Sequence, residues 1–172
     1  NGAQPGLCLD HGIEKIAALE QIYRGRIATC VADPLTLERA IADADLVIGA
    51  VLIPGKLSPK FVSRALLRKM RPGSVIVDVG IDQGGIAETS RPTSHSEPVF
   101  VEEGIVHYCV PNMPGAVPQT STFALTNVTI RYAIEIADRG LVGAVRASRH
   151  LAEGVNTYDG ACTCEPVARA HG

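Results

Sequence analysis

Short apolar runs alternate with amphipathic segments along the first two thirds of the chain. Apolar runs without polar alternation are typical of strands that are buried on both faces of a parallel sheet. These runs predict strands at residues 6–10, 26–31, 45–51, 74–79 and 105–110. Between two of the runs, one helical face is indicated by the three- and four-residue spacing of Leu37, Ala40, Ile41 and Ala44. The predicted strand ends recur at intervals of about 20 to 30 residues, the span of a βαβ unit.

Helix-start patterns support the same alternation. Asp33 and Pro34 combine an N-cap acid with a proline at the first helical position. Ser58 and Pro59 repeat the pattern and predict a helix that runs to about Met70. Strands separated by amphipathic helices predict an α/β fold, a doubly wound parallel sheet of the Rossmann type.

The pattern changes after Pro118. One long amphipathic helix is predicted around residues 125–136, with Arg139 and Gly140 at its C-terminal end. A short helix, a turn at residues 158–160 and a last helical segment follow, without alternating strands. This helical tail is too small to form a core alone, so we expect it to pack on something else.

Composition and charge exclude several classes of function. The chain has 16 basic and 18 acidic residues and a net charge of -2, which argues against a nucleic-acid binder. Aromatic residues make up 4% and tryptophan is absent, so stacking platforms for single strands are not expected either. No apolar run approaches the ~18 residues of a membrane helix, and no secretory signal opens the chain. We expect neither a nucleic acid nor a membrane as partner.

Five cysteines occur at irregular spacing. Cys8, Cys30 and Cys109 fall in predicted strands, which favours free core thiols in a reducing compartment. Cys162 and Cys164 could form a metal or redox pair, but no partner pair stands at zinc spacing. No metal site is predicted.

Asp10 is the first candidate binding residue, because ligands of a doubly wound fold lie beyond the carboxyl ends of its strands. An acid at the end of the second strand accepts hydrogen bonds from the adenosine ribose, and its charge favours NAD over NADP. Alternatively, Asp10 caps the helix predicted from Ile13, and the residues alone leave both interpretations open. Lys15 could reach the adenosine or remain a solvated charge.

A glycine-rich phosphate loop is expected ~20 residues before such an acid. That position lies upstream of Asn1, which is not a methionine. We therefore expect an incomplete fold that begins at its second strand, with the first strand and the glycine-rich loop missing. The neighbouring strand edges are then expected to be unpaired.

Two polar segments follow later predicted strands. In residues 79–85, the glycines let the backbone approach a flat ring such as nicotinamide. Asp82 in this segment could orient or ionise a reacting group, or it could be a structural acid of the turn. In residues 112–122, prolines lower the entropy cost of holding Asn112 in place, and a linker that crosses between domains is compatible with this role.

Four stretches carry a resemblance to a known family: ADLVIGAVLIPG, MRPGSVIVDVGIDQGG, RPTSHSEP and NMPGAVPQTSTFALTN. They are similar to motifs in the second half of alanine dehydrogenase, along nearly the whole chain. The resemblance implies reversible, NAD-dependent oxidative deamination of L-alanine to pyruvate and ammonia, by a homo-oligomer, commonly a hexamer, in the cytoplasm. It also implies that residues 1–118 form a partial NAD-binding domain and that residues 119–172 belong to the substrate domain.

The resemblance also assigns roles to single residues. It places Asp10 on the ribose, Lys15 near the adenosine, and Val51, Leu52 and Val79 around the coenzyme. It makes Asp82 the catalytic acid and places Asn112 and Met113 in the loop that faces nicotinamide and substrate. Water addition to the iminium and ammonia release both move protons, so a positioned acid or base is required. The family's catalytic His and substrate-binding Lys and Arg lie in the other half, so we expect this chain to be inactive alone.

Three positions depart from the family pattern. Ala32 stands where a hydroxyl residue often holds the coenzyme, Pro111 replaces a small residue, and Gln119 replaces a basic one. Two other functions remain open from the sequence: the NAD-binding subunit of a proton-translocating transhydrogenase, and a non-catalytic nucleotide-binding module.

Overall fold

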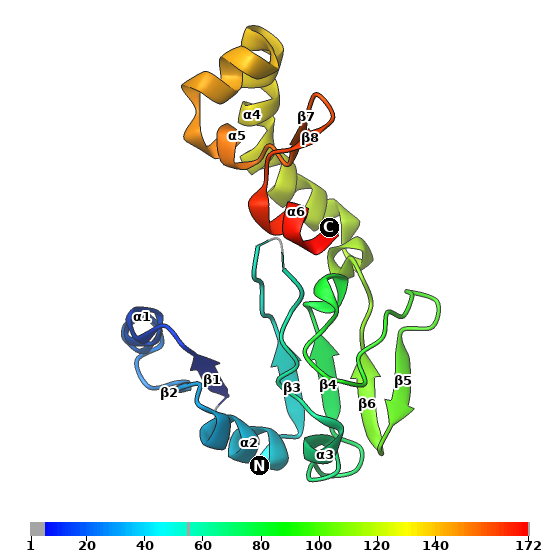
Figure 1. Ribbon diagram of the computed structural model, residues 1–172. Coiled ribbons are helices and arrows are strands. Elements are labelled where there is room, and N and C mark those ends of the chain that lie inside the picture. Colours follow the sequence, from blue (N-terminus) through cyan, green and yellow to red (C-terminus); the bar gives the residue numbers. More distant parts are fainter. Residues whose placement is uncertain (1–5, 55, 172) are drawn as a thin grey trace.

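The computed structural model describes residues 6–54 and 56–171 (Figure 1). An α/β body contains β1 (Leu7–Asp10), α1 (Ile13–Tyr23), β2 (Ala28–Val31), α2 (Pro34–Asp43), β3 (Leu46–Gly49), α3 (Arg64–Leu67), β4 (Val75–Asp78), β5 (Val99–Glu102) and β6 (Ile105–Tyr108). The 3-10 helices η1 (Ile81–Gln83) and η2 (Met113–Ala116) follow β4 and β6. The tail contains α4 (Pro118–Ala147), α5 (Arg149–Glu153), β7 (Thr157–Tyr158), β8 (Ala161–Cys162) and α6 (Glu165–His171).

The strands of the body form two separate sheets. β1 and β2 are a parallel pair, and the larger sheet has the order β3-β4-β6-β5. β3, β4 and β6 are parallel to one another, which confirms the predicted α/β class. Among the described strands, β1 pairs only with β2 and β3 only with β4, so each has one side without a neighbouring strand. The residues before Gly6, where the predicted first domain starts, lie outside the described residues.

β5 is a strand that the sequence analysis missed. It runs antiparallel to β6, so the larger sheet is mixed rather than purely parallel. Glu103 and Gly104 join the two strands, and both have positive φ values, 53° and 77°, as a two-residue hairpin turn requires. Phe100 stacks on the buried His107 of β6 with 4.8 Å between ring centroids. The predicted strand at 105–110 is correct in position but is not the last, since β7 and β8 follow.

The predicted helix from Ser58 to Met70 is wrong over its first half. The helix α3 begins at Arg64, after Ser63, whose side chain accepts a hydrogen bond from the Leu66 amide. Upstream of it, Val62 forms a parallel bridge with Ala87 and donates its amide hydrogen to the Ile86 carbonyl at 3.0 Å. A non-local partner therefore takes the hydrogen bond that a helix from Ser58 would need.

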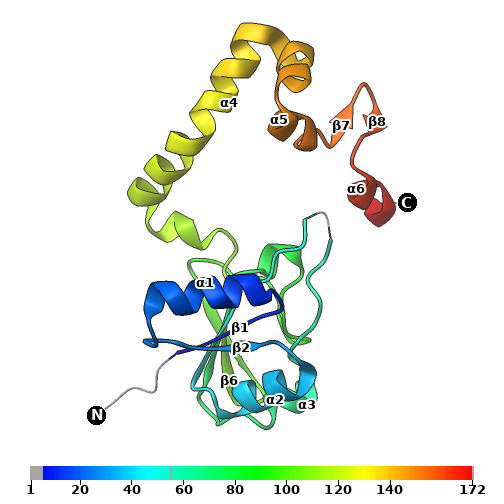
Figure 2. The ribbon, with the colours of Figure 1, turned by 90° about the vertical axis from the view of Figure 1, so that its left-hand side faces the viewer.

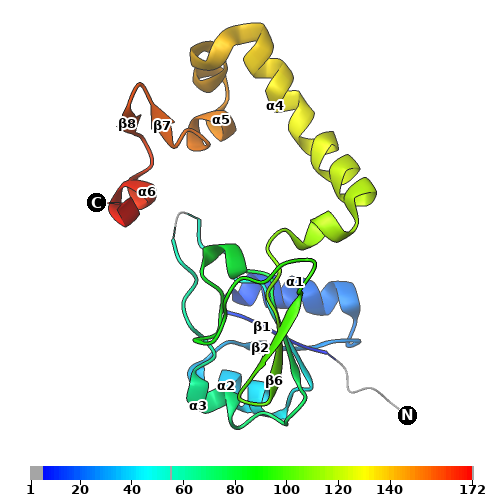
Figure 3. The same cartoon turned by 90° about the vertical axis from the view of Figure 1, so that its right-hand side faces the viewer.

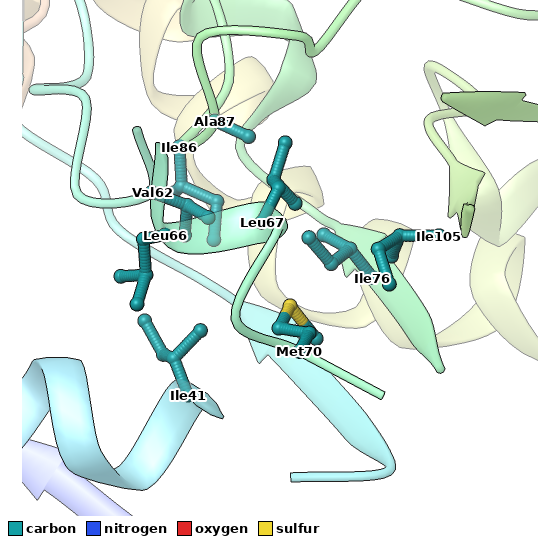
Figure 4. Packing of buried hydrophobic residues seen from close by; sticks show 9 residues of the cluster. All are labelled: Ile41, Val62, Leu66, Leu67, Met70, Ile76, Ile86, Ala87 and Ile105. Carbon is teal, nitrogen blue, oxygen red and sulfur yellow. The ribbon is translucent and has the colours of Figure 1, made fainter. Parts of the chain in front are cut away.

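The hydrophobic core lies where α2 and α3 cover one face of the larger sheet (Figure 4). Its buried members are Ile41, Val62, Leu66, Leu67, Met70, Ile76, Ile86, Ala87 and Ile105. One contact ties a strand to a loop: a Cβ at Gly49 would overlap the Ile86 side chain and lie 2.6 Å from its Cγ1. Only a glycine at position 49 therefore lets Ile86 lie across β3.

The tail extends away from the body as a long arm (Figures 2 and 3). Gly140, the predicted helix end, has non-helical φ and ψ of 67° and 163°, but the helix resumes and reaches Ala147. The β7–β8 hairpin corrects the expectation of a tail without strands. In the described part of the tail, Ala144 is the buried hydrophobic residue. Large apolar side chains of α4 are exposed: Phe123, Leu125, Val128, Ile130 and Ile134. The tail thus has no core of its own.

The cysteines bear on the expectation of free core thiols. All five cysteines are free; Cys109 is buried, whereas Cys8 and Cys30 are partly buried. Cys162 is exposed in the β7–β8 hairpin, and its thiol donates a hydrogen bond to the Cys164 carbonyl.

Across the described residues, we find no helix with the length and apolar character needed to cross a membrane.

A carboxylate–arginine cluster joins the β5–β6 hairpin to α3. Glu103 accepts hydrogen bonds from Arg68 Nε at 3.0 Å and from Arg64 Nη1 at 3.1 Å. These hydrogen bonds lower the pKa of Glu103 from 4.5 to about 2. Since the pKa is lower in the folded chain, the ionised carboxylate contributes stability above pH 4.5, and this contribution is lost as the pH falls towards 2.

We expect Glu103→Gln to lower the free energy of unfolding at pH 6, by an amount that shrinks with added salt. The difference from wild type should narrow as the pH falls from about 4.5 to about 2, because protonation of Glu103 removes the same charge. Urea unfolding at a series of pH values measures this difference in the free energy of unfolding. Glu97→Gln, at an exposed carboxylate without a described ion pair, is the control. A difference that is independent of pH would contradict the assignment.

Candidate functional site

The candidate site lies at one edge of the larger sheet. Because β3, β4 and β6 are parallel, their carboxyl ends meet at the same edge (Figure 1). Three loops leave this edge, one after each strand. Ligands of open α/β sheets bind outside the carboxyl ends of the strands, so these three loops form the candidate site.

A hollow of about 250 Å³ lies between the loops that follow β3 and β4. Its lining residues are Ala50, Val51, Leu52, Val79, Gly80, Asp82 and Gln83. The structure thus brings together four of the residues singled out from the sequence: Val51, Leu52, Val79 and Asp82. Leu52 is 70% exposed, although its side chain is large and apolar. The hollow therefore offers an exposed hydrophobic surface beside the Asp82 carboxylate.

Asp82 lies on η1, in a turn that is built by the backbone. The Gly84 amide donates to the Ile81 carbonyl at 2.9 Å, and the Gly85 amide donates to the Gly80 carbonyl at 3.1 Å. Gly84 and Gly85 have φ values of 91° and 75°, which only glycine adopts without strain. No hydrogen bond to the Asp82 carboxylate is formed by any described residue, and its side chain is exposed. The carboxylate therefore does not hold the turn, and it is exposed at the hollow.

Asn112 and Met113 lie in the loop after β6, at the same sheet edge, but they do not line the 250 Å³ hollow. Asn112 has φ of 54° and ψ of 49°, a left-handed conformation that asparagine tolerates well. Its carbonyl accepts hydrogen bonds from the Gly115 amide at 2.8 Å and from His95 Nε2 at 3.3 Å. His95, for which no role is predicted from the sequence, thus lies against the Asn112 loop.

Asp10 and Lys15 lie apart from this group, on the β1–β2 pair and α1. Asp10 Oδ1 accepts a hydrogen bond from the Gly12 amide at 2.7 Å, and Oδ2 lies 3.8 Å from Lys15 Nζ. The bond from Gly12 and the nearby Lys15 charge lower the pKa of Asp10, so it is ionised at neutral pH. Gly12 occupies the N-cap position of α1, so the alternative in which Asp10 is the capping residue is not what the structure shows.

Sequence reasoning missed the segment that supports the Asp82 turn from outside. The Ser58 amide donates to the Gln83 carbonyl at 2.8 Å. Lys60 Nζ donates to the carbonyls of Gly84 and Gly85. These contacts are between residues about 24 positions apart, and no local pattern signals them.

A second hollow of about 370 Å³ lies elsewhere, between the loop after Ser90 and β5. It is lined by Arg91, Pro92, Thr93, Ser94, Glu97, Val99 and Phe100. None of the predicted site residues borders it. In the described part of the chain, no three His, Cys, Asp or Glu side chains come together as a metal site would require.

The comparison with protein families decides the relationship. The model described as "Alanine dehydrogenase/PNT, C-terminal domain" matches residues 6–165. The chain belongs to the alanine dehydrogenase/PNT family. Its resemblance to that family, noted from four sequence stretches, is confirmed along almost its whole length.

Relatives with curated descriptions support the same family. Alanine dehydrogenase of Halomonas elongata is 49% identical over 164 residues, which are 95% of this chain and 44% of that protein. Alanine dehydrogenase of Bacillus subtilis is 48% identical over 162 residues, 94% of this chain and 43% of that protein. The chain therefore spans less than half the length of these relatives.

Among solved structures, the chain is more similar to an L-alanine dehydrogenase than to a transhydrogenase. An L-alanine dehydrogenase superposes with a TM-score of 0.84 at 42% identity, over 96% of this chain and 46% of that one. A transhydrogenase from Sinorhizobium meliloti superposes with a TM-score of 0.59 at 22% identity, over 92% of this chain and 49% of that one. The second likeness concerns the fold alone.

The Asp82 turn leads to a first prediction for the site. A Cβ at Gly85 would overlap Asp78 Oδ2 and lie 2.6 Å from Ser90 Cβ, whereas a Cβ at Gly25 would meet nothing within 4 Å. Both glycines have similar φ, 75° and 78°, so an alanine at either costs about 1–2 kcal/mol for the left-handed conformation. We expect Gly85→Ala to cost a further 1–3 kcal/mol, roughly, from overpacking. Urea unfolding of both variants measures this, and equal losses would contradict it.

Proposed function

We propose that this chain is the coenzyme-binding part of an alanine dehydrogenase, which converts L-alanine and NAD to pyruvate, ammonia and NADH. The observation that carries the proposal is the hollow at the sheet edge, where Asp82 stands beside Val51, Leu52 and Val79. The identity of 48–49% to curated alanine dehydrogenases along nearly the whole chain supports it. The catalytic acid, the coenzyme contacts and the domain boundary after residue 118 are parts of this proposal.

The residues present fit a dinucleotide such as NAD. The ionised Asp10 suits the hydroxyls of the adenosine ribose, and its charge would repel the 2′-phosphate of NADP. Lys15 lies beside it on the adenosine side. The apolar side chains of Val51, Leu52 and Val79 offer a surface for the flat nicotinamide ring. When bound, NAD supplies the acceptor for the hydride of the alanine Cα.

The role of Asp82 follows from what remains after hydride transfer. Water must add to the iminium carbon, and ammonia must leave the resulting carbinolamine, and each step moves a proton. A carboxylate that is exposed to the hollow and not engaged with described residues can take a proton from water and return it to the leaving nitrogen. Asn112 and Met113 lie on the loop that faces the same sheet edge, and we assign them to substrate and ring contacts.

The tail completes the proposal. The exposed apolar side chains of α4 require another surface, and we assign residues 119–172 to the substrate domain. The chain spans 44% of the Halomonas elongata relative, so we propose that the remaining substrate-binding residues lie outside these 172 residues. A homo-oligomer in the cytoplasm belongs to the same proposal. Transhydrogenase is disfavoured as the alternative, because the likeness is 22% identical in sequence.

The first experiment tests activity and the role of Asp82 in the full gene product that contains this chain. We expect L-alanine-dependent NADH formation, and a kcat lower by ~100-fold or more in Asp82→Asn, since positioned proton transfer contributes roughly 10²–10⁴. Asp159→Asn, in the exposed β7–β8 turn, is the control. Near-normal kcat in Asp82→Asn would reduce Asp82 to a turn residue.

A second experiment tests coenzyme choice. We expect Asp10→Ser to lower kcat/KM for NAD and raise it for NADP, so that the preference for NAD falls about 10-fold or more, which corresponds to roughly 1.4 kcal/mol. Asp33→Asn, which keeps the N-cap of α2 after the adjacent strand, should leave the preference unchanged. Initial rates with each coenzyme measure the ratio. An unchanged ratio in Asp10→Ser would remove Asp10 from the ribose site.

A further inference from the structure

Asp78 is a buried carboxylate for which the proposed mechanism has no use. It ends β4 and is 0% exposed. Its Oδ2 accepts hydrogen bonds from the Ile86 amide at 2.7 Å and from Ser90 Oγ at 2.6 Å. Both bonds converge on one oxygen of a carboxyl group that is buried away from solvent. Asp78 thus fastens two points of the following loop to the strand from which that loop departs.

The loop that Asp78 fastens is the one that carries Asp82. Gly80 and Gly85 mark its two ends, and the Gly80 carbonyl accepts hydrogen bonds from the Gln83 and Gly85 amides at 2.9 and 3.1 Å. A Cβ at Gly80 would lie 3.7 Å from Asp78 Oδ1, and one at Gly85 would overlap Oδ2. The Gly85 end of the Asp82 turn therefore lies against the Asp78 carboxyl group, with no room for a side chain between them.

The two oxygens of the Asp78 carboxyl group differ in their hydrogen bonding. Oδ1 is buried and has no hydrogen-bond partner among the described residues. A buried carboxylate oxygen without a partner costs stability. The bonds at Oδ2 offset this cost, because without them the Ile86 amide and the Ser90 hydroxyl would lose their acceptor. The benefit visible in the structure is the fixed geometry of the Asp82 turn.

We propose that Asp78 is a positioning residue, which holds the loop after β4 so that the Asp82 carboxylate stands at a defined place in the hollow. This inference rests on the proposed function, in which Asp82 moves the proton. Asp78 touches no reacting atom; it acts through Asp82.

A double-mutant cycle in the full gene product tests the inference. We expect Asp78→Asn to lower kcat for alanine oxidation about 10- to 100-fold, because a displacement of ~1 Å at a catalytic group has effects of this size, with KM for NAD changed less than about 3-fold. In an Asp82→Asn background, the same substitution should lower the residual kcat less than about 3-fold, because no carboxylate remains to be positioned.

Two further variants keep the test decisive. Ser74→Ala is the matched control. Ser74 is buried directly before β4, at the opposite end of the strand from Asp78, and its hydroxyl donates to the Ala44 carbonyl. The Ser74→Ala substitution should leave kcat unchanged both with and without the Asp82 carboxylate. Ser90→Ala removes one of the two donors to Asp78 and should show the pattern of Asp78→Asn at smaller size. It also replaces Asp78→Asn in the cycle if that variant does not fold.

The inference would be overturned if Asp78→Asn lowered kcat by the same factor with and without the Asp82 carboxylate, or if it left kcat unchanged. If the wild-type gene product does not oxidise alanine, the proposed function has failed, and hydrogen exchange of the amides at 84–87 then decides the positioning. Faster exchange in Asp78→Asn and Ser90→Ala than in Ser74→Ala supports it. Equal exchange in all three variants overturns it.

Discussion

Hydrogen bonding between the parallel strands β3, β4 and β6 determines where every candidate catalytic group can stand. The ladders place Gly49 opposite Asp78 and Val77 opposite Tyr108, so the three strands end nearly level with one another. Three loops then leave one edge side by side, although they are far apart in the sequence. Below this edge, the core of α2 and α3 packs against one face of the same sheet (Figure 4).

The loops at this edge divide the work between backbone and side chains. Backbone hydrogen bonds and left-handed glycines shape the Asp82 turn, and the Gly115 amide stabilises the bend at Asn112. The polar side chains of Asp82 and Asn112 are consequently not consumed in building their own loops. This separation is typical of functional loops on a rigid scaffold, where ordering takes place during folding and does not have to be repeated when a ligand binds.

Much of this arrangement could be predicted from local patterns, because buried parallel strands and capped helices leave marks within a few residues. The Asp33-Pro34 helix start is confirmed, and the run at 74–79 correctly placed Asp82 just after a strand. β5 escaped prediction because it is a four-residue edge strand whose valines face solvent. The false helix from Ser58 shows the opposite error, since a genuine local signal lost to a non-local partner of Val62. The support of the Asp82 turn by Asp78 and Lys60 exists only in three dimensions.

The contact between Gly49 and Ile86 has an evolutionary consequence. The side chain of Ile86 lies where a Cβ of residue 49 would be, so a strand residue and a loop residue share one volume. A larger residue at position 49 is compatible with this backbone only when a smaller one is present at position 86. Homologous chains should therefore exchange these two positions as a pair, and such paired changes would mark lineages in which the packing of the loop after β4 against β3 has been rebuilt.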